Sequence, residues 1–478
     1  MKSQACFSVI VFCHCSLRFI IALLLYIGSA QLLFAEQSLG PLIGNVTSTS
    51  VKIWAKSAQP EKIIFTVYLS DELYTQEIIS TERDNSSVYA EFSGLKSGVK
   101  YNYHVRSSSL DYKGTFNTHD VIPNKATKIA FGGCYDQSTI DQEKGEIFNS
   151  ILHYQPDLML FTGDIPYSKA GELDDLRKGH ELIRSNKHFR NLTSKTPVLA
   201  VWDDHDFGEN NSDGNNPNKT QALRAFREHW PNPKNEDSSV EGMYTKYVIN
   251  NVEVFLLDTR FYSQQSNDTP TLLGDKQEEW LCNNLKKSKS KYKAIVSGVA
   301  LSSKNVDGWS GEYFKEDKNK LLNCIYDNKI SGAIFISGDL HRTEVHRHKL
   351  HNNPFLLNRY IYDFSVSPLN AMSLKIAKNV DKSLYYGNDS IKSMFGLLEF
   401  SSNQMDDNTV RFQLVDAAQH ELKQIVLEAE DLNLDWRNNK RLELDVFTIT
   451  YSIFAIISGF IVILVVFKKV VGRTSQRL

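Results

Sequence analysis

The sequence has no surplus of either charge. Its 54 lysine and arginine residues nearly balance 56 aspartate and glutamate residues, so the formal net charge is -2 at pH 7. Proteins that bind nucleic acids carry a basic excess, and no nucleic-acid-binding surface is therefore expected. The chain also lacks low-complexity blocks and internal repeats, while its hydrophobic content of 41% is that of a globular protein. We expect two folded domains plus appendages within the 478 residues.

The first appendage is a predicted signal peptide over residues 1–35. Lys2 and Arg18 precede a short apolar run, residues 19–27, and small residues follow it. This order is typical of a secretory signal, with cleavage after Ala30 or Ala35. The alternative is a retained membrane anchor, but the apolar run is shorter than a bilayer span.

Cysteine is scarce as well, with six residues, three of which lie in the predicted signal peptide. An odd number, Cys134, Cys282 and Cys324, remains for a body that folds in an oxidising compartment. We expect one disulfide, between Cys282 and Cys324, and a special role for Cys134.

A long uncharged run occurs only near the carboxyl end, at Val446–Phe467. Its 22 residues are enough to cross a bilayer as a transmembrane helix. Basic residues follow it over 468–478, which predicts a cytoplasmic tail and an extracellular or lumenal body. A charged, asparagine-rich stalk is predicted at 430–445. The expected location is that of a single-pass type I membrane protein of the secretory route, at the cell surface or in a lumenal, for example lysosomal, membrane.

Predicted N-glycans agree with this topology. Seven Asn-x-Ser/Thr sequons lie on the outer side, at Asn45, Asn85, Asn191, Asn210, Asn218, Asn267 and Asn388.

The amino-terminal part of the body, residues 36–122, is predicted to be a β-sandwich. Short alternating runs such as 51–54, 63–68 and 88–92 are separated by turn residues. Residues 94–105 look like the tyrosine corner of fibronectin-type sandwiches. Nothing in this part carries site chemistry, so it is interpreted as a structural module.

Residues 123–429 show a different, α/β pattern. Apolar strands around 128–134, 157–162 and 197–201 alternate with helical segments at 145–154 and 173–189, which is the βαβ rhythm of an α/β fold. Further strands are predicted near 252–258, 293–298 and 333–338, with helices at 219–229, 274–286 and 318–328. Sites in such sheets form at the carboxyl ends of the strands.

Five of these strands end in residues with site chemistry. They are Cys134, Asp164 with Tyr167, Asp203 to Asp206, Asp258 with Arg260, and Asp339 with His341. A single Gly-Asp after a strand is a common turn, and Asp203 to Asp206 alone is equally compatible with an acidic surface turn. The repetition at the same end of successive strands predicts convergence, and metal ions are the usual partners of carboxylates and imidazoles.

The same motifs, in the same order, resemble PhoD-type alkaline phosphatases. Gly-Gly-Cys, Gly-Asp-x-x-Tyr, Trp-Asp-Asp-His-Asp, Leu-Asp-Thr-Arg and Ser-Gly-Asp-x-His occur between Lys128 and Pro368. These enzymes belong to the metallophosphoesterases, which include the purple acid phosphatases. The resemblance implies a four-layer α/β sandwich of the metallophosphoesterase type after the fibronectin-like module.

The resemblance also implies a site with two or more metal ions. Its metal ligands would be Cys134, Asp164, Tyr167, Asp204, Asp339 and His341, with Asp164 between the ions and Asp204 on the second ion. Fe³⁺ plus Ca²⁺, or another divalent ion, is favoured. His205 would contact the phosphate or protonate the leaving group, and Arg260 would clamp a phosphate oxygen or instead pack against Asp258. No equivalent is found for the histidine that many relatives place near Ser297-Gly298. His346 and His348 are expected at the surface.

The predicted function is metal-dependent hydrolysis of small-molecule or lipid phosphate esters by metal-activated hydroxide, in an ectoenzyme anchored to the membrane. A phosphodiesterase or phospholipase D-like activity is an alternative, because the sequence does not separate monoesters from diesters. A catalytically silent cell-surface binding protein is the other class, but it is expected to have lost part of the acidic set.

Overall fold

The computed structural model describes residues 37–120, 125–137, 145–168, 172–265, 269–350, 359–376, 382–402 and 409–434. The predicted signal peptide, the span at 446–467 and the tail lie outside these residues, as does the stalk after Leu434. Among the helices of the described segments, none has the length and apolar character needed to cross a bilayer.

The first folded unit consists of two antiparallel sheets. One contains β1 (Leu39–Gly44), β2 (Ser50–Lys56) and β5 (Ser87–Ser93); the other has the order β4 (Glu72–Ile79), β3 (Lys62–Leu69), β6 (Lys100–Arg106) and β7 (Asp111–Asn117). Alternate residues of β3, Ile63, Phe65 and Val67, are buried in the shared core. The Lys96 amide donates to the Tyr101 hydroxyl at 2.9 Å, which confirms the predicted tyrosine corner.

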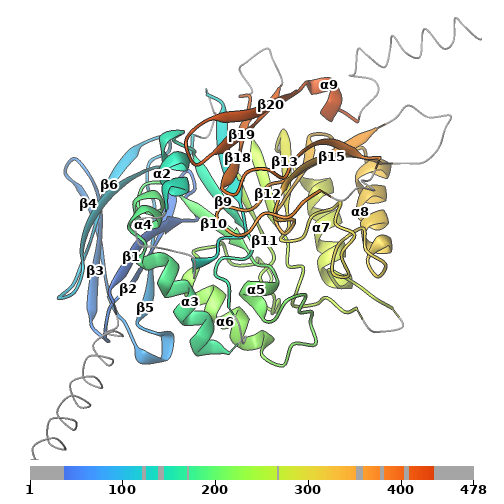
Figure 1. Ribbon diagram of the computed structural model, residues 1–478. Coiled ribbons are helices and arrows are strands. Elements are labelled where there is room, and N and C mark those ends of the chain that lie inside the picture. The colour runs from blue at the N-terminus through green and yellow to red at the C-terminus, as the bar shows by residue number, and fades with distance from the viewer. Residues whose placement is uncertain are drawn as a thin grey trace, which may run out of the picture.

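Buried polar contacts attach this sandwich to the rest of the chain. The Trp54 indole donates to the Glu228 carbonyl at 2.8 Å, and the Tyr103 hydroxyl donates to the Ser194 carbonyl at 2.7 Å. Figure 1 shows the sandwich at one side of the molecule, beside α3 (Leu173–Ser185) and α4 (Lys187–Thr193).

The second unit is an α/β fold with two mixed sheets. The first has the order β10 (Val198–Val201), β9 (Leu158–Thr162), β8 (Thr127–Gly132), β18 (Met394–Phe400), β19 (Val410–Asp416) and β20 (Glu421–Leu427). The second has the order β11 (Thr245–Ile249), β12 (Val252–Leu256), β13 (Tyr292–Val296), β14 (Ala333–Ser337), β16 (Tyr360–Ser365), β15 (Thr343–Lys349) and β17 (Leu384–Asn388). The strands β8, β9 and β10 are parallel, as are β12, β13, β14 and β16.

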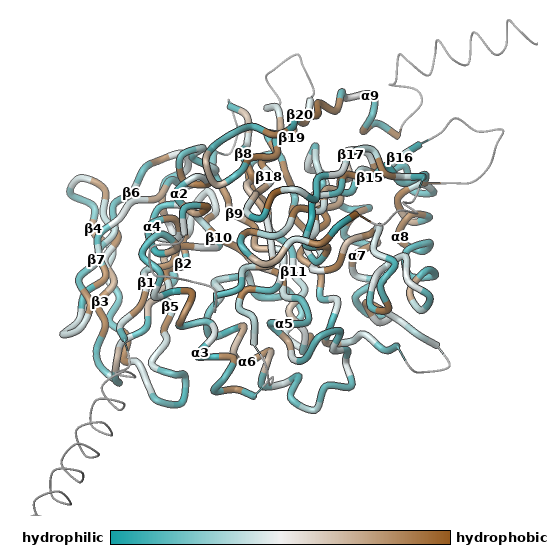
Figure 2. Tube along the Cα trace, viewed as in Figure 1, coloured by the Kyte–Doolittle hydropathy of each residue, from teal (hydrophilic) through white to brown (hydrophobic). Residues whose placement is uncertain are grey.

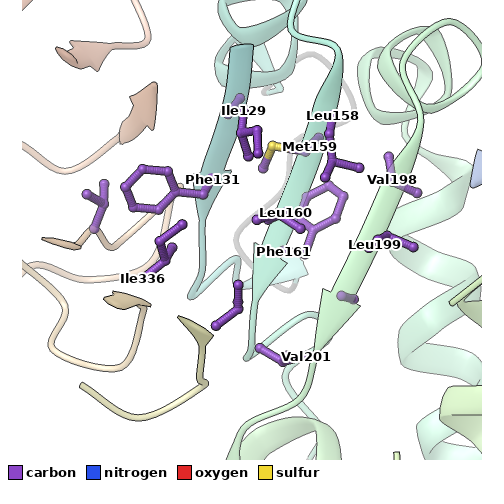
Figure 3. Packing of buried hydrophobic residues seen from close by; sticks show 14 of the residues in the cluster. Ile129, Phe131, Leu158, Met159, Leu160, Phe161, Val198, Leu199, Val201 and Ile336 are labelled. Atoms are coloured by element: carbon purple, nitrogen blue, oxygen red, sulfur yellow. The ribbon is translucent and has the colours of Figure 1, made fainter. Parts of the chain in front are cut away.

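The two sheets bury apolar faces in a common core. Ile129 and Phe131 of the first sheet belong to the same cluster as Ile336 of the second (Figure 3). Helices α2 (Glu146–His153), α3, α4 and α6 (Lys219–His229) contribute to this cluster, while α7 (Asp275–Lys287) and α8 (Lys315–Asp327) pack on the outer face of the second sheet. Figure 2 shows hydrophobic segments along the strands and hydrophilic segments in outer loops.

The predicted strands and helices of this unit are present except that one helix is divided, and the strands β11 and β15 to β20 were not predicted. Residues 173–189 were expected to form a single helix, but the chain leaves helical geometry at Asn186. The Asn186 side chain accepts hydrogen bonds from the amides of His188 and Phe189, so it caps α4 and starts a new helix.

Candidate metal centre

The site forms where the carboxyl ends of the parallel strands of both sheets meet. Cys134 follows β8, Asp164 follows β9, α5 (Asp204–Phe207) follows β10, and Asp339 follows β14. Two glycines allow this approach, because a Cβ on Gly338 would lie 2.5 Å from the Thr162 carbonyl oxygen and one on Gly298 would lie 2.4 Å from that of Trp202. Gly298 therefore has no room for a side chain.

Four of the expected ligands have left-handed backbone conformations. The φ angles are 57° at Cys134, 57° at Asp164, 67° at Asp339 and 53° at His341. None of these residues is glycine, so each conformation costs free energy that the surrounding structure must offset. Backbone strain of this kind is common at functional sites. Here the left-handed conformations direct the four side chains toward one region.

The first cluster contains Cys134, Asp164 and His341. One ligand atom from each lies within 4.8 Å of the others, and the Cys134 Sγ is 3.6 Å from the Asp164 Oδ2. The Tyr167 hydroxyl lies 2.8 Å from the His341 Nε2, which adds a phenol oxygen to the group. The His341 Nδ1 is bonded to the Met372 carbonyl at 2.6 Å, so this ring nitrogen is protonated and Nε2 faces the cluster.

The second cluster contains Asp164, Asp204 and His205, again within 4.8 Å. Main-chain amides hold its carboxylates: the His205 amide donates to Asp164 at 3.2 Å and to Asp204 at 2.9 Å. The Asn211 amide donates to the other Asp204 oxygen at 2.6 Å. Asp164 is the residue common to both clusters.

The mouth of the site is formed by aromatic rings. The His205 imidazole stacks on the Tyr167 ring with 4.3 Å between centroids and 25° between planes. Both side chains are partly exposed, as is His341, whereas Cys134 and Asp164 are buried. A molecule that enters from solvent therefore meets His205 before it reaches the buried carboxylates.

A third group of charges lies beneath the mouth. The Arg260 guanidinium is 1% exposed and donates to Asp203 at 2.7 Å and to Asp307 at 2.9 Å. A further N–H donates to the Ser212 carbonyl at 3.2 Å. The Arg260 side chain thus donates hydrogen bonds to two buried carboxylates. Only the main-chain amide of Arg260 bonds Asp258, at 3.0 Å.

Burial raises the pKa values of several acidic groups here, although Arg260 and His205 lower the pKa of Asp204. Burial and then the charge of Asp204 raise the pKa of Asp164 well above its usual range. Burial and then Asp307 raise the pKa of Asp339 to about 8. Burial and then Asp164 raise the pKa of the Cys134 thiol. The raised pKa values have one physical cause, because several negative charges would share a small volume that contains little water.

The residues fit metal ions. The Oδ2 atoms of Asp203 and Asp339 and the Oδ1 of Asp307 are buried with no hydrogen-bond partner among the described residues. Such oxygens are costly unless a proton or a cation occupies the space beside them. Thiolate, phenolate, imidazole and carboxylate together form a donor set for a transition metal, and a group of carboxylates alone suits a harder ion.

The structure brings most of the predicted site residues together, and it adds two groups. Cys134, Asp164, Tyr167, Asp204, His205 and His341 meet, with Asp339 beside Asp204 and Asp307 in the charge network. The Asp307 carboxylate and the Asn211 amide were not anticipated, and no sequence signal marks Asp307. Asp206 belongs to the predicted acidic run Asp203 to Asp206, but no role was predicted for it.

Another expectation concerned His346 and His348 and was wrong. They were expected at the surface, but they are 1% and 4% exposed on β15. The His346 Nε2 pairs with Glu344 at 2.8 Å, the two histidine rings stack, and the His348 Nδ1 lies 3.3 Å from the Lys318 Nζ of α8.

Comparisons with known proteins place this site in context. The sequence model of the family described as PhoD-like phosphatase matches residues 131–406. Alkaline phosphatase D of Bacillus subtilis (strain 168) is 24% identical over 387 residues, which are 64% of this chain and 64% of that protein. The chain thus matches less than two thirds of the length of this curated relative.

Two solved structures share the fold. A structure of PhoD aligns with a TM-score of 0.66 at 16% identity and covers 83% of this chain and 89% of its own. Purple acid phosphatase PPD1 from yellow lupin aligns with a TM-score of 0.61 at 10% identity and covers 82% of this chain and 74% of its own.

Proposed function

The chain belongs to the PhoD-like phosphatase family, and from that premise we propose that it hydrolyses phosphate esters at a metal centre built around Asp164. The observation that carries this proposal is the position of Asp164 in both ligand clusters. A carboxylate shared by two clusters can hold two cations close together, an arrangement that would stabilise both the attacking and the leaving oxygen of an in-line displacement at phosphorus.

The proposed ligand sets follow the chemistry of the donors. Cys134, Tyr167 and His341 with Asp164 would hold Fe³⁺, since phenolate oxygen is a hard donor and both thiolate and phenolate are known iron ligands. Asp204 and Asp339 with Asp164 would hold Ca²⁺ or another divalent ion, since oxygen ligands suit it. When bound, these cations would neutralise the phosphate oxygens and increase the acidity of an attacking water.

His205 is proposed as the proton donor to the leaving oxygen. It lies at the mouth, partly exposed, and its amide is bonded to both Asp164 and Asp204. Stacking on Tyr167 fixes the plane of the imidazole. An imidazole is a common general acid, so His205 can deliver a proton to the leaving alkoxide.

Arg260 is proposed as a positioning residue rather than a phosphate clamp. Its buried guanidinium contacts Asp203 and Asp307, which line the acidic volume next to Asp339. It would limit the negative charge there and hold the turn after β10, on which Asp204 and His205 are placed.

Membrane anchoring by residues 446–467, N-glycans and a lumenal or extracellular catalytic domain are part of the proposal. They rest on the apolar run, the basic tail and the sequons. A catalytically silent binding protein is disfavoured, because all five residues of the two clusters and the adjoining Tyr167 and Asp339 remain.

The proposal is tested with the full chain in detergent. Metal content is measured by elemental analysis, and hydrolysis is measured on an aryl phosphate monoester and an aryl phosphate diester, before and after chelation. We expect iron and a second metal, hydrolysis of at least one substrate class, and visible absorption from thiolate or phenolate bound to Fe³⁺. Absence of hydrolysis by the metal-loaded chain would contradict the proposal, and a colourless, iron-free but active chain would reject the iron assignment.

A further inference from the structure

The loop between β13 and α8, residues 297–314, contacts the metal centre on the side of Asp339. The Ser303 hydroxyl forms a hydrogen bond with the Asp339 carboxylate, and the Asp307 carboxylate accepts one from the Arg260 guanidinium at 2.9 Å. Ser303 and Asp307 are 3% and 2% exposed. The loop thus supplies two buried polar groups to the part of the centre in which carboxylates gather.

A lysine on α8 closes the base of this loop. The Lys318 ammonium group donates to the Leu301 carbonyl at 3.1 Å and to the Ser310 hydroxyl at 2.6 Å. The Ser310 hydroxyl in turn donates to the Leu301 carbonyl at 2.8 Å, and the Ser310 amide donates to the Ser303 carbonyl at 2.8 Å. The two ends of the turn that carries Ser303 and Asp307 are therefore joined through a side chain from outside the loop.

A histidine and an aspartate extend this buried chain of polar contacts. The His348 Nδ1 lies 3.3 Å from the Lys318 Nζ. An ammonium group can only donate, so Nδ1 accepts and the proton of the imidazole is on Nε2. That nitrogen lies 3.8 Å from the Asp363 Oδ2, and the same oxygen accepts a hydrogen bond from the Ser302 amide at 3.2 Å. Lys318 and Asp363 thus hold the loop at two consecutive residues, Leu301 and Ser302.

The loop also has an apolar anchor of its own. Trp309 is fully buried and packs edge-on against Phe335 of β14, with 5.8 Å between the ring centroids. Its indole N–H donates to the Ser297 hydroxyl at 3.2 Å. This anchor holds the loop against the second sheet independently of Lys318. The lysine is therefore expected to set the position of the turn at the site, whereas Trp309 keeps the loop in the fold.

We propose that Lys318, His348 and Asp363 are positioning residues for the second cation, because they fix the loop that places the Ser303 hydroxyl against Asp339. This inference rests on the second cation of the proposed function, for which Asp339 is a proposed ligand. The proposed iron ligands lie outside this loop. Loss of a positioning residue should therefore weaken the binding of the divalent ion and leave the iron in place.

The test measures both metal sites in the full chain in detergent. After chelation of the divalent ion, the binding of Ca²⁺, Mn²⁺ and Zn²⁺ is titrated by calorimetry, and iron is followed by elemental analysis and visible absorption. In Lys318→Met, the ion that the wild type binds most tightly should bind about tenfold more weakly, the lower end of the usual cost of losing a group that orients a ligand. Iron content should not change.

Matched variants show whether the contact itself matters. Lys318→Arg keeps a cationic donor and should restore most of the affinity. Lys320→Met is the control, because Lys320 also lies on α8 but pairs with Glu278 at the surface. Ser310→Ala removes the same closure with a smaller change in volume and should also weaken the divalent ion. The double variant Lys318→Met/Ser310→Ala should bind it no more weakly than Lys318→Met, because the two side chains share one contact.

Hydrogen exchange of the chelated chain gives a readout that needs no metal. Amides of residues 297–314 should exchange faster in Lys318→Met than in the wild type or in Lys320→Met. Equal exchange in this loop would overturn the proposal, and so would wild-type affinity for the divalent ion in Lys318→Met or an equal loss of iron and divalent ion. A wild-type chain that binds none of the three ions would overturn it through the second cation. Hydrolysis of aryl phosphates, measured separately on the wild type, decides the proposed function.

Discussion

The Asp206 carboxylate accepts a hydrogen bond from the main-chain amide of Asp164 at 2.6 Å. It also accepts from the amides of Ile165 at 3.0 Å and Asp203 at 2.9 Å. One buried side chain therefore fixes the turns after β9 and β10, from which Asp164 and Asp204 project. Asp206 is a positioning residue for the centre.

The substitution Asp206→Asn should weaken metal binding about 10- to 100-fold, the usual cost of losing a group that orients a ligand. The amide keeps one acceptor oxygen but lacks the charge that attracts three N–H donors. The measurement is a metal-binding titration of the chelated protein. Asp237→Asn is the matched control, because Asp237 accepts a main-chain hydrogen bond from Ser239 in an exposed turn. Wild-type affinity in Asp206→Asn would contradict this role.

The substitution Arg260→Met should lower the free energy of unfolding by about 3–5 kcal/mol, because it leaves Asp203 and Asp307 buried without their cation. Denaturant unfolding measures the change. Lys320→Met is the control, since Lys320 is half exposed and pairs with Glu278 at the surface, and its loss should cost only about 0–1 kcal/mol. If both variants lose the same small amount, the buried network does not stabilise the fold.

The metal-free protein should lose stability as pH rises from about 4 to about 8. Burial raises the pKa of Asp206 to about 7, and burial followed by Asp307 raises that of Asp339 to about 8, from an ordinary value of 3.8. The folded state therefore binds more protons than the unfolded state in this interval, and the free energy of unfolding falls with pH.

Thermal unfolding of chelated protein across this pH range measures the effect. Asp339→Asn should flatten the curve in the upper part of the range, because the amide does not ionise, and added metal should flatten it by neutralising the carboxylates. A melting temperature of the chelated wild type that rises steadily from pH 4 to pH 8 would contradict the prediction.

The disulfide between Cys282 and Cys324 joins α7 to α8, as expected from the sequence, and encloses a separation of 42 residues. A loop of this length predicts a loss of about 4 kcal/mol when both cysteines are replaced by alanine, if the bond acts through the entropy of the unfolded chain. Denaturant unfolding of Cys282→Ala/Cys324→Ala, with Cys134 retained, measures it. An unchanged unfolding midpoint would show that the packing of α7 on α8 suffices.

Much of this fold could be predicted from the sequence because local patterns determine it. The apolar strands ending at Gly132, Thr162 and Val201 and the helices between them follow from periodicity, and parallel strands necessarily bring their carboxyl ends to one edge. Asn186 shows what apolar periodicity does not predict. The helical apolar pattern continues past this residue, but its side chain caps α4 and divides the segment into two helices.

The parts that could not be predicted depend on contacts between distant segments. Arg260 meets Asp203 and Asp307, 57 and 47 residues away, and no local pattern records either pairing. For the same reason the sequence does not predict that the Arg260 guanidinium points toward these carboxylates and not toward the mouth of the site. His346 and His348 are buried by contacts that no local pattern records: Ser383 bonds the His346 ring, and Lys318 of α8 bonds the His348 ring.

The central claim is that Asp164 joins two metal sites whose ions would activate the phosphate ester, and that His205 protonates the leaving oxygen. The direct test is a side-by-side measurement of metal content and aryl phosphate turnover in Asp164→Asn and His205→Ala. We predict that Asp164→Asn loses both metal and turnover, whereas His205→Ala keeps its metal and loses about 10²- to 10⁴-fold in turnover. Full metal content and full turnover in Asp164→Asn would contradict the account.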